Sequence, residues 1–115
     1  MIFGYCRVST KGQAKDGNSL QAQEQEILSR YNDAQIYKEA YTGTTTDRPV
    51  FNDVIQKMKE KDMLVVNKLD RLARNTEEGI KIVKDLFQKK CSVHVLNVGL
   101  LEDTAMGQFF ITTLL

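Results

Sequence analysis

Short apolar runs alternate along this chain with amphipathic segments of helical period, and this alternation limits its fold more than any other feature. The runs rich in β-prone side chains are residues 2–8, 34–40, 63–66 and 92–98. The clearest helical pattern, with apolar residues at i, i+3, i+4 and i+7, is Phe51, Val54, Ile55 and Met58. Strands that alternate with helices predict an α/β domain of three layers, with a mostly parallel central sheet and helices on both faces.

Polar residues before the helical patterns are the expected helix caps. Asn18, with a glutamine three residues later, is typical of a helix start. Asp47 is expected to cap a second helix, with Pro49 in its first turn, where the missing N–H costs little. Thr76 is expected to cap a third helix that ends at about Lys90.

The composition is that of a globular domain with balanced charge. The chain has 115 residues, of which 42% are hydrophobic and 27% are charged, with a formal net charge of +1. Neither half is a polybasic arm, so a DNA function would depend on a local cluster or on sequence outside this chain. No apolar run approaches the ~20 residues of a membrane helix, and the first residues lack a signal-peptide pattern, so we expect a cytoplasmic protein with no membrane partner.

The end of the chain and its two cysteines are informative in different ways. Residues 104–115 are typical of an apolar helix that is cut off at its start, so we expect a fragment with a catalytic domain at 1–103. Cys6 and Cys91 lack the spacing of a zinc site and are expected to be buried free thiols.

The arginines gather where a parallel sheet places its chemistry. Ligands bind beyond the carboxyl ends of such strands, here the loops 9–18, 41–48, 67–75 and 99–103. Four of the five arginines lie in or beside these loops: Arg7, Arg48, Arg71 and Arg74. Single arginines are usually separate solvated charges. Because four share one end of the sheet, we favour a convergent pocket for one phosphodiester.

Ser9 follows the first strand and is the candidate nucleophile. A serine there is most often a turn or cap residue. A serine-hydrolase triad is disfavoured, because the Gly-x-Ser-x-Gly motif is missing and His94, the single histidine, lies within a strand. Attack on a phosphorus surrounded by guanidinium groups fits better. Asp70 is expected to orient Arg71 or Arg74 through an ion pair, or to protonate the leaving oxygen.

Cofactor motifs are missing from the sequence. It contains no phosphate-binding loop and no Gly-x-Gly-x-x-Gly motif, so no nucleotide cofactor is expected. Asp70, Glu102 and Asp103 are the candidates for a catalytic metal site, but each lacks a paired partner motif. We therefore expect no metal and no small-molecule cofactor.

Five short motifs follow one another along the chain: residues 5–10 (YCRVST), 19–23 (SLQAQ), 46–49 (TDRP), 68–74 (KLDRLAR) and 106–108 (MGQ). In this order they resemble the serine site-specific recombinases of the resolvase/invertase family over nearly the whole chain. The extended loop 11–18 is more similar to the large serine recombinases than to the small resolvases.

The resemblance implies a resolvase-like fold and a mechanism for the recombination of mobile DNA. Ser9 would attack the scissile phosphate of double-stranded DNA, form a 5′-phosphoserine link and release a 3′ hydroxyl, without a cofactor. Arg7, Arg48, Arg71 and Arg74 would bind the phosphate, with Asp70 aligning them or assisting the leaving group. Gln23 would form hydrogen bonds near the site. Full-length members pair as homodimers that join into a tetramer.

Three other interpretations remain open. The first is a flavodoxin- or receiver-like module that binds a phosphate-bearing ligand or a protein, although a receiver needs acidic residues where Ser9 and Thr10 stand. The second is a recombinase domain without activity that is kept for protein interactions. The third is a serine hydrolase.

Overall fold

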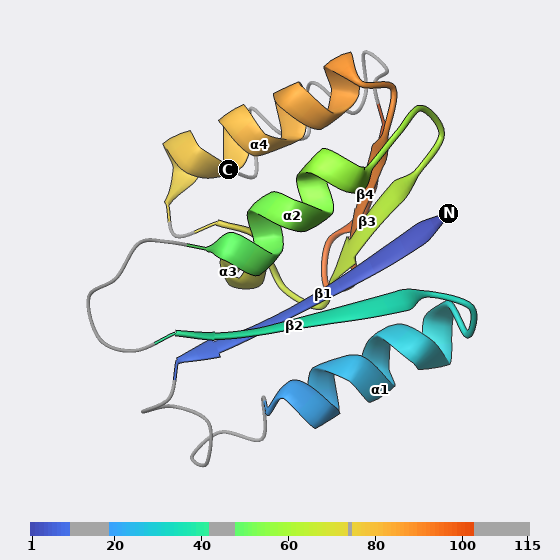
Figure 1. Ribbon diagram of the computed structural model, residues 1–115, viewed down its shortest axis with the longest axis vertical. Helices are drawn as coiled ribbons and strands as arrows, with labels where there is room; N and C mark the ends of the chain where they lie inside the picture. The colour runs from blue at the N-terminus through green and yellow to red at the C-terminus, as the bar shows by residue number, and fades with distance from the viewer. Residues whose placement is uncertain (10–18, 42–47, 74, 103–115) are drawn as a thin grey trace.

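The computed structural model describes residues 1–9, 19–41, 48–73 and 75–102 (Figure 1). Its strands are β1 (Ile2–Ser9), β2 (Gln35–Tyr41), β3 (Met63–Val66), β4 (Ser92–Val95) and β5 (Gly99–Leu101). Its helices are α1 (Leu20–Arg30), α2 (Pro49–Lys57), α3 (Leu69–Leu72) and α4 (Thr76–Gln88). The strands form one sheet in the order β2-β1-β3-β4-β5, in which the β4–β5 pair is antiparallel and the other pairs are parallel.

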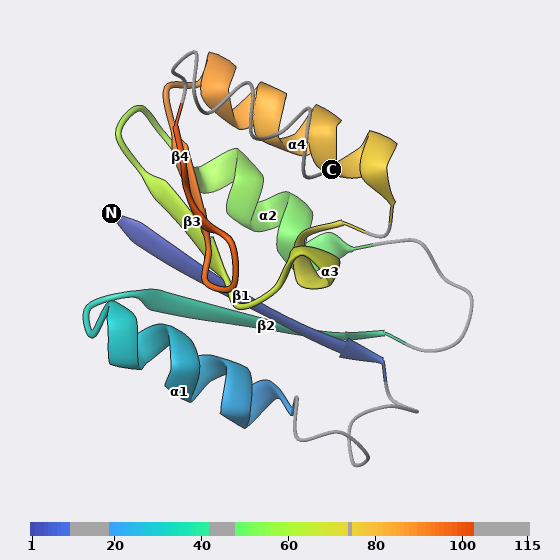
Figure 2. The ribbon, with the colours of Figure 1, turned by 180° about the vertical axis from the view of Figure 1, so that it is seen from behind.

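The sheet is covered on both faces, which confirms the three-layer α/β architecture. Helix α1 lies on one face, and α2 and α4 lie side by side on the other, as the two opposite views show (Figures 1 and 2). No helix in the part of the chain described above is long and apolar enough to cross a bilayer.

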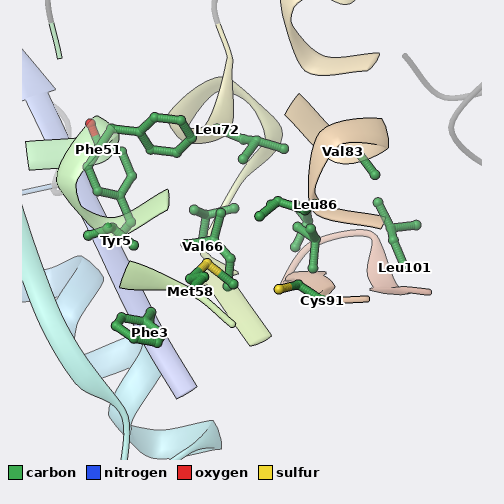
Figure 3. Packing of buried hydrophobic residues seen from close by; sticks show 14 of the residues in the cluster. Phe3, Tyr5, Phe51, Met58, Val66, Leu72, Val83, Leu86, Cys91 and Leu101 are labelled. Atoms are coloured by element: carbon green, nitrogen blue, oxygen red, sulfur yellow. The ribbon is translucent and has the colours of Figure 1, made fainter. Parts of the chain in front are cut away.

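Strand β3 explains why its sequence is a continuous apolar run. Val65 packs with Ile27 and Cys6 on the α1 face, whereas Leu64 and Val66 belong to the larger cluster on the opposite face. That larger cluster joins α2, α4 and α3 to the sheet (Figure 3). A strand that is buried on both faces needs apolar residues at every position, not at alternate ones.

Strands β1 and β3 separate before their carboxyl ends. β1 pairs with β3 only from Ile2↔Met63 to Gly4↔Val65, but it pairs with β2 as far as Ser9↔Tyr41. The chain order also reverses direction between β1 and β3, and such a switch point is where open α/β sheets bind their ligands.

The expected core face of α2 is confirmed, but the expected caps are not. Phe51, Val54 and Met58 are buried and Ile55 is half-buried. The observed N-caps are instead Ser19 for α1, Arg48 for α2 and Asn75 for α4. Ser19 and Asn75 accept the N–H groups of the third residue after them, so the capping geometry lies one residue away from the expected positions.

Three further expectations about local structure are corrected. The run 92–98 is a strand only as far as Val95, because residues 96–98 turn the chain back into the antiparallel strand β5. Residues 99–101 of the expected loop 99–103 are therefore a strand. The expected loop 67–75 contains the one-turn helix α3, whose last residue, Leu72, is buried.

Candidate active site

Arg7 lies on the part of β1 that extends beyond β3, and it is 3% exposed. Its backbone N–H has no neighbouring strand on that side. The side-chain amide of Gln23 on α1 makes the hydrogen bonds that a neighbouring strand would otherwise make. Its Oε1 accepts from the Arg7 N–H at 3.0 Å, and its Nε2 donates to the Arg7 carbonyl at 3.1 Å. Gln23 therefore fixes the backbone of β1 at Arg7, two residues before the strand ends at Ser9.

Two arginines from different elements contact the α3 turn. Arg7 Nη2 donates to the Asp70 carbonyl at 2.5 Å, and Arg48 Nη1 donates to the Leu72 carbonyl at 2.8 Å. Their guanidinium groups come from the end of β1 and the start of α2, and the turn follows the end of β3. The structure thus brings Arg7 and Arg48 together around the segment that carries Asp70 and Arg71.

The guanidinium of Arg48 is enclosed on several sides. It lies 4.0 Å above the centre of the Phe51 ring and makes an ion pair of 3.1 Å between Nη2 and Glu78 Oε1. Its side chain is only 10% exposed. Burial, followed by repulsion from Arg7, lowers the pKa of Arg48 from its ordinary value, although nearby acidic groups oppose this shift.

A buried carboxylate that sequence reasoning missed organises the start of α2. Glu39 on β2 is 5% exposed and accepts the N–H groups of Val50 and Phe51, at 2.9 and 3.2 Å. It also accepts the hydroxyl of Tyr5 at 2.5 Å. Burial and the Glu39 carboxylate raise the pKa of Tyr5 far above its ordinary value, so the phenol keeps its proton.

The signal that could have revealed Glu39 is its register. It is the cross-strand partner of Arg7, and it lies in a strand-like run that precedes a helix whose first turn has no acidic residue. An acidic side chain near a helix N-terminus binds the unpaired N–H groups there, and it also favours the helix dipole.

Asp70 and Arg71 form only a loose pair. Arg71 Nε lies 3.8 Å from Asp70 Oδ1, and the Asp70 side chain is 71% exposed. The Arg71 side chain is 17% exposed, so it is held against the domain more closely than Asp70. The Asp70 backbone carbonyl thus accepts a hydrogen bond from Arg7, whereas the exposed Asp70 carboxylate makes a looser contact with Arg71.

Two expected site residues fall outside what can be described in full. Ser9 ends β1 opposite Tyr41, but its side chain lies outside the described part, as does the whole of Arg74.

His94 lies on β4, where Nδ1 shares a hydrogen bond of 2.5 Å with the Tyr31 hydroxyl after α1. It is a packed histidine, as expected. Cys6 and Cys91 are buried free thiols, also as expected.

Fold and site together define a class of protein. It is a doubly wound α/β domain in which the buried Arg7 and the largely enclosed Arg48 lie at the point where the strand order reverses. Comparison with known families makes this specific. Residues 2–115 match the family model described as Resolvase, N terminal domain. The chain belongs to the resolvase family.

Its relatives include transposon resolvases and phage recombinases. The chain is 37% identical to the Transposon Tn917 resolvase of Enterococcus faecalis, with 96% of this chain and 56% of that protein covered. It is 33% identical to the serine recombinase gin of Escherichia phage Mu, over 96% of this chain and 54% of that protein. The chain thus spans a little over half the length of these relatives.

A solved structure has the same fold. The N-terminal catalytic domain of TP901-1 integrase is 30% identical to this chain and covers 98% of it, with 90% of that domain covered and a TM-score of 0.71. The chain is therefore similar in sequence to a resolvase, and similar in both sequence and architecture to an integrase domain.

Proposed function

We propose that this chain is the catalytic domain of a site-specific DNA recombinase that cuts and rejoins DNA through a 5′-phosphoserine intermediate. The observation that carries the proposal is the convergence of Arg7 and Arg48 on the α3 turn, beside the strand that ends at Ser9. Guanidinium groups bind phosphate oxygens in a planar, bidentate way and stabilise the charge of a phosphoryl transition state.

The proposed reaction is a balanced exchange of one phosphodiester for another. The Ser9 Oγ forms a bond to phosphorus, the bond from phosphorus to the 3′ oxygen breaks, and the proton lost by Ser9 is matched by one gained at the 3′ hydroxyl. The reverse attack by a 3′ hydroxyl rejoins the strand and frees Ser9. Because the ester bond is conserved, neither a nucleotide cofactor nor a metal ion is needed.

The arginines share one role in this proposal, and Asp70 and Gln23 have others. Arg7, Arg48, Arg71 and Arg74 bind the phosphate and stabilise its pentacoordinate transition state. Asp70 aligns this group or assists the leaving oxygen. Gln23 acts as a positioning residue, since its amide holds the Arg7 backbone and leaves the guanidinium to the site.

We propose that the substrate and the assembly are those of a longer protein that contains this domain. We propose double-stranded DNA as the substrate, with homodimers that join into a tetramer. Residues 1–103 form the catalytic domain, and 104–115 begin the long helix. The length of the sequence segment 11–18 supports the large serine recombinase subgroup. A DNA substrate is also consistent with the cytoplasmic location expected from the sequence.

The proposal is tested with a chimera. The domain is joined through a family-type long helix to a DNA-binding domain of known site, and it is incubated with that site flanking a permissive core. A denaturing gel then shows whether protein stays attached to DNA. We expect an adduct with the wild-type domain and none with Ser9→Ala. If neither forms an adduct while a related catalytic domain does in the same chimera, the domain is inactive or a binding module.

A further inference from the structure

The ion pair between Arg48 and Glu78 joins the candidate active site to helix α4. Its nitrogen and oxygen atoms, Nη2 and Oε1, are 3.1 Å apart, and the side chains are 10% and 25% exposed. A pair this shielded from water interacts more strongly than an exposed one. Glu78 therefore acts directly on a guanidinium that is expected to bind the DNA phosphate.

Glu78 is held in place by its own helix. It is the third residue of α4, and its N–H donates to the Asn75 side chain at 2.8 Å. In a capping box, a glutamate at this position reaches back to the N-cap backbone. Here the Glu78 carboxylate reaches across to Arg48 at the start of α2. Because the cap fixes the first turn, the carboxylate approaches Arg48 from a rigid element.

The charges around Arg48 explain why such a partner is present. Arg7 and Arg48 contact carbonyls two residues apart on α3, and their like charges repel each other. Buried cations without a counter-ion are costly. Two carboxylates of the described residues act on Arg48. Glu39 accepts the Tyr5 hydroxyl and two N–H groups of α2, whereas Glu78 makes the ion pair with the guanidinium.

We propose that Glu78 is the built-in counter-ion of Arg48, which stabilises the site when no phosphate is bound and which the phosphate must displace or share. Glu78 thereby lowers the affinity of the empty domain for phosphate. This inference rests on the proposed function, because it takes Arg48 to be a phosphate-binding residue. It adds a role for α4 in the strength with which the site binds DNA phosphate.

The chain offers a matched control for a test of this role. Glu77 lies beside Glu78 in the same helical turn and is exposed, so Glu77→Gln removes the same charge from the same helix N-terminus without touching Arg48. Glu78→Gln removes the charge but keeps the size and one oxygen acceptor. Inorganic phosphate is titrated into the 115-residue chain, and binding is followed by nitrogen-15 NMR of the Arg48 guanidinium and by thermal unfolding.

We expect Glu78→Gln to bind phosphate about three- to tenfold more tightly than the wild-type chain, whereas Glu77→Gln stays within about twofold. Without phosphate, Glu78→Gln should unfold at a lower temperature than Glu77→Gln, and phosphate should reduce this difference. Glu78→Asp, with a shorter side chain, should weaken the ion pair and give a smaller gain in affinity, and it replaces Glu78→Gln if that variant does not fold.

Equal phosphate affinities in the Glu78 and Glu77 variants would overturn the counter-ion role, as would weaker binding by Glu78→Gln. The chimera separates this outcome from a failure of the proposed function. If the wild-type chimera forms the Ser9 adduct but the variants bind phosphate equally, only the role of Glu78 fails. If no adduct forms although Glu78→Gln binds phosphate more tightly, the recombinase proposal fails and the counter-ion role at Arg48 stands.

Discussion

The side chain of Gln23 makes the two hydrogen bonds to the Arg7 backbone that a neighbouring strand would otherwise make. Where β1 extends past β3, a buried backbone N–H and carbonyl at Arg7 would lack partners, and an unpaired buried polar group costs about 1–3 kcal/mol. The fully buried amide of Gln23 carries both a donor and an acceptor, so it satisfies both groups at once. An apolar residue on this face of α1 could pack there but could not hold the end of β1.

Gln23→Ala should lower the free energy of unfolding by about 2–4 kcal/mol, because two buried backbone groups lose their partners and a cavity remains. Gln25→Ala, an exposed change on the same helix, should alter it by less than about 0.5 kcal/mol. Urea denaturation of both variants measures the difference. Similar stabilities in the two variants would mean that Gln23 does not support β1.

His94 should make the stability of the domain depend on pH. Burial, and to a smaller degree the charge of Arg30, lowers the pKa of His94 below its ordinary value of 6.5. The unfolded chain therefore binds a proton before the folded one does, and stability falls as the pH drops below about 6.5, by at most about 1.4 kcal/mol per pH unit. His94 is the single histidine of the chain.

Urea denaturation between about pH 7.5 and 5.5 measures this slope. In His94→Gln the part of the slope due to the imidazole should vanish, leaving only the contribution of carboxylates at the acid end. The same slope in the variant and in the wild-type chain would contradict the assignment.

At single residues, the sequence predicted the position of charged side chains better than what those side chains contact. Arg7 and Arg48 could be placed at one end of the sheet, because the carboxyl ends of parallel strands share an edge. Their carbonyl partners on α3 could not, because these contacts depend on how far β1 extends past β3. Glu39 was missed because its hydrogen-bond partner Tyr5 lies on the neighbouring strand β1, so the contact depends on how β1 and β2 pair.

Helix α4 ends in a Schellman motif with a lysine where glycine is usual. The Cys91 N–H donates to the Leu86 carbonyl and the Lys90 N–H to the Phe87 carbonyl, both at 2.9 Å. Cys91 and Leu86 belong to the same buried cluster, as this motif requires. Lys90 has a φ of 63°, in the left-handed region that a side chain makes unfavourable.

Lys90→Gly should raise the free energy of unfolding by about 1 kcal/mol, because glycine adopts this conformation without strain. The matched control is Gln88→Gly, which places glycine in the last helical position and should lower stability by up to about 1 kcal/mol. Thermal or urea unfolding gives both values. A loss of stability in Lys90→Gly would show that the lysine side chain stabilises the fold by more than its backbone strain costs.

At the level of elements, long periodic or continuous patterns predicted the structure and short ones did not. The strand at 63–66 and the apolar face of α2 were correct, since burial imposes their composition. Strand β5 has three residues, too few to show a period, and it forms by pairing with β4. The caps were displaced by one residue because neighbouring polar residues compete for each position.

For the whole molecule, charge and topology lead to different expectations about DNA. The net charge is +1, while Arg7 and Arg48 both contact the α3 turn at the carboxyl end of the sheet. Affinity for DNA comes mainly from the number of phosphates that a protein neutralises. A domain built to react with one phosphate is therefore expected to leave most of the affinity to other parts of a full-length recombinase.

The 115-residue chain alone should bind duplex DNA more weakly than about 10 μM near physiological salt, and the slope of log affinity against log salt should be no steeper than about −4. It should recombine nothing. Fluorescence anisotropy over a series of salt concentrations tests the binding. Tight binding that is insensitive to salt would mean that this domain reads DNA by itself.

The central claim is that Ser9 becomes bonded to a 5′ phosphate, and mapping the covalent link in the chimera tests it most directly. The adduct is trapped, digested with protease and nuclease, and analysed by tandem mass spectrometry, while end-labelled DNA identifies the attached end. We predict a phosphodiester on Ser9 joined to a 5′ end, with a free 3′ hydroxyl on the other side of the break. A link at another residue, a link to the 3′ end, or cleavage without any protein attached would contradict the mechanism.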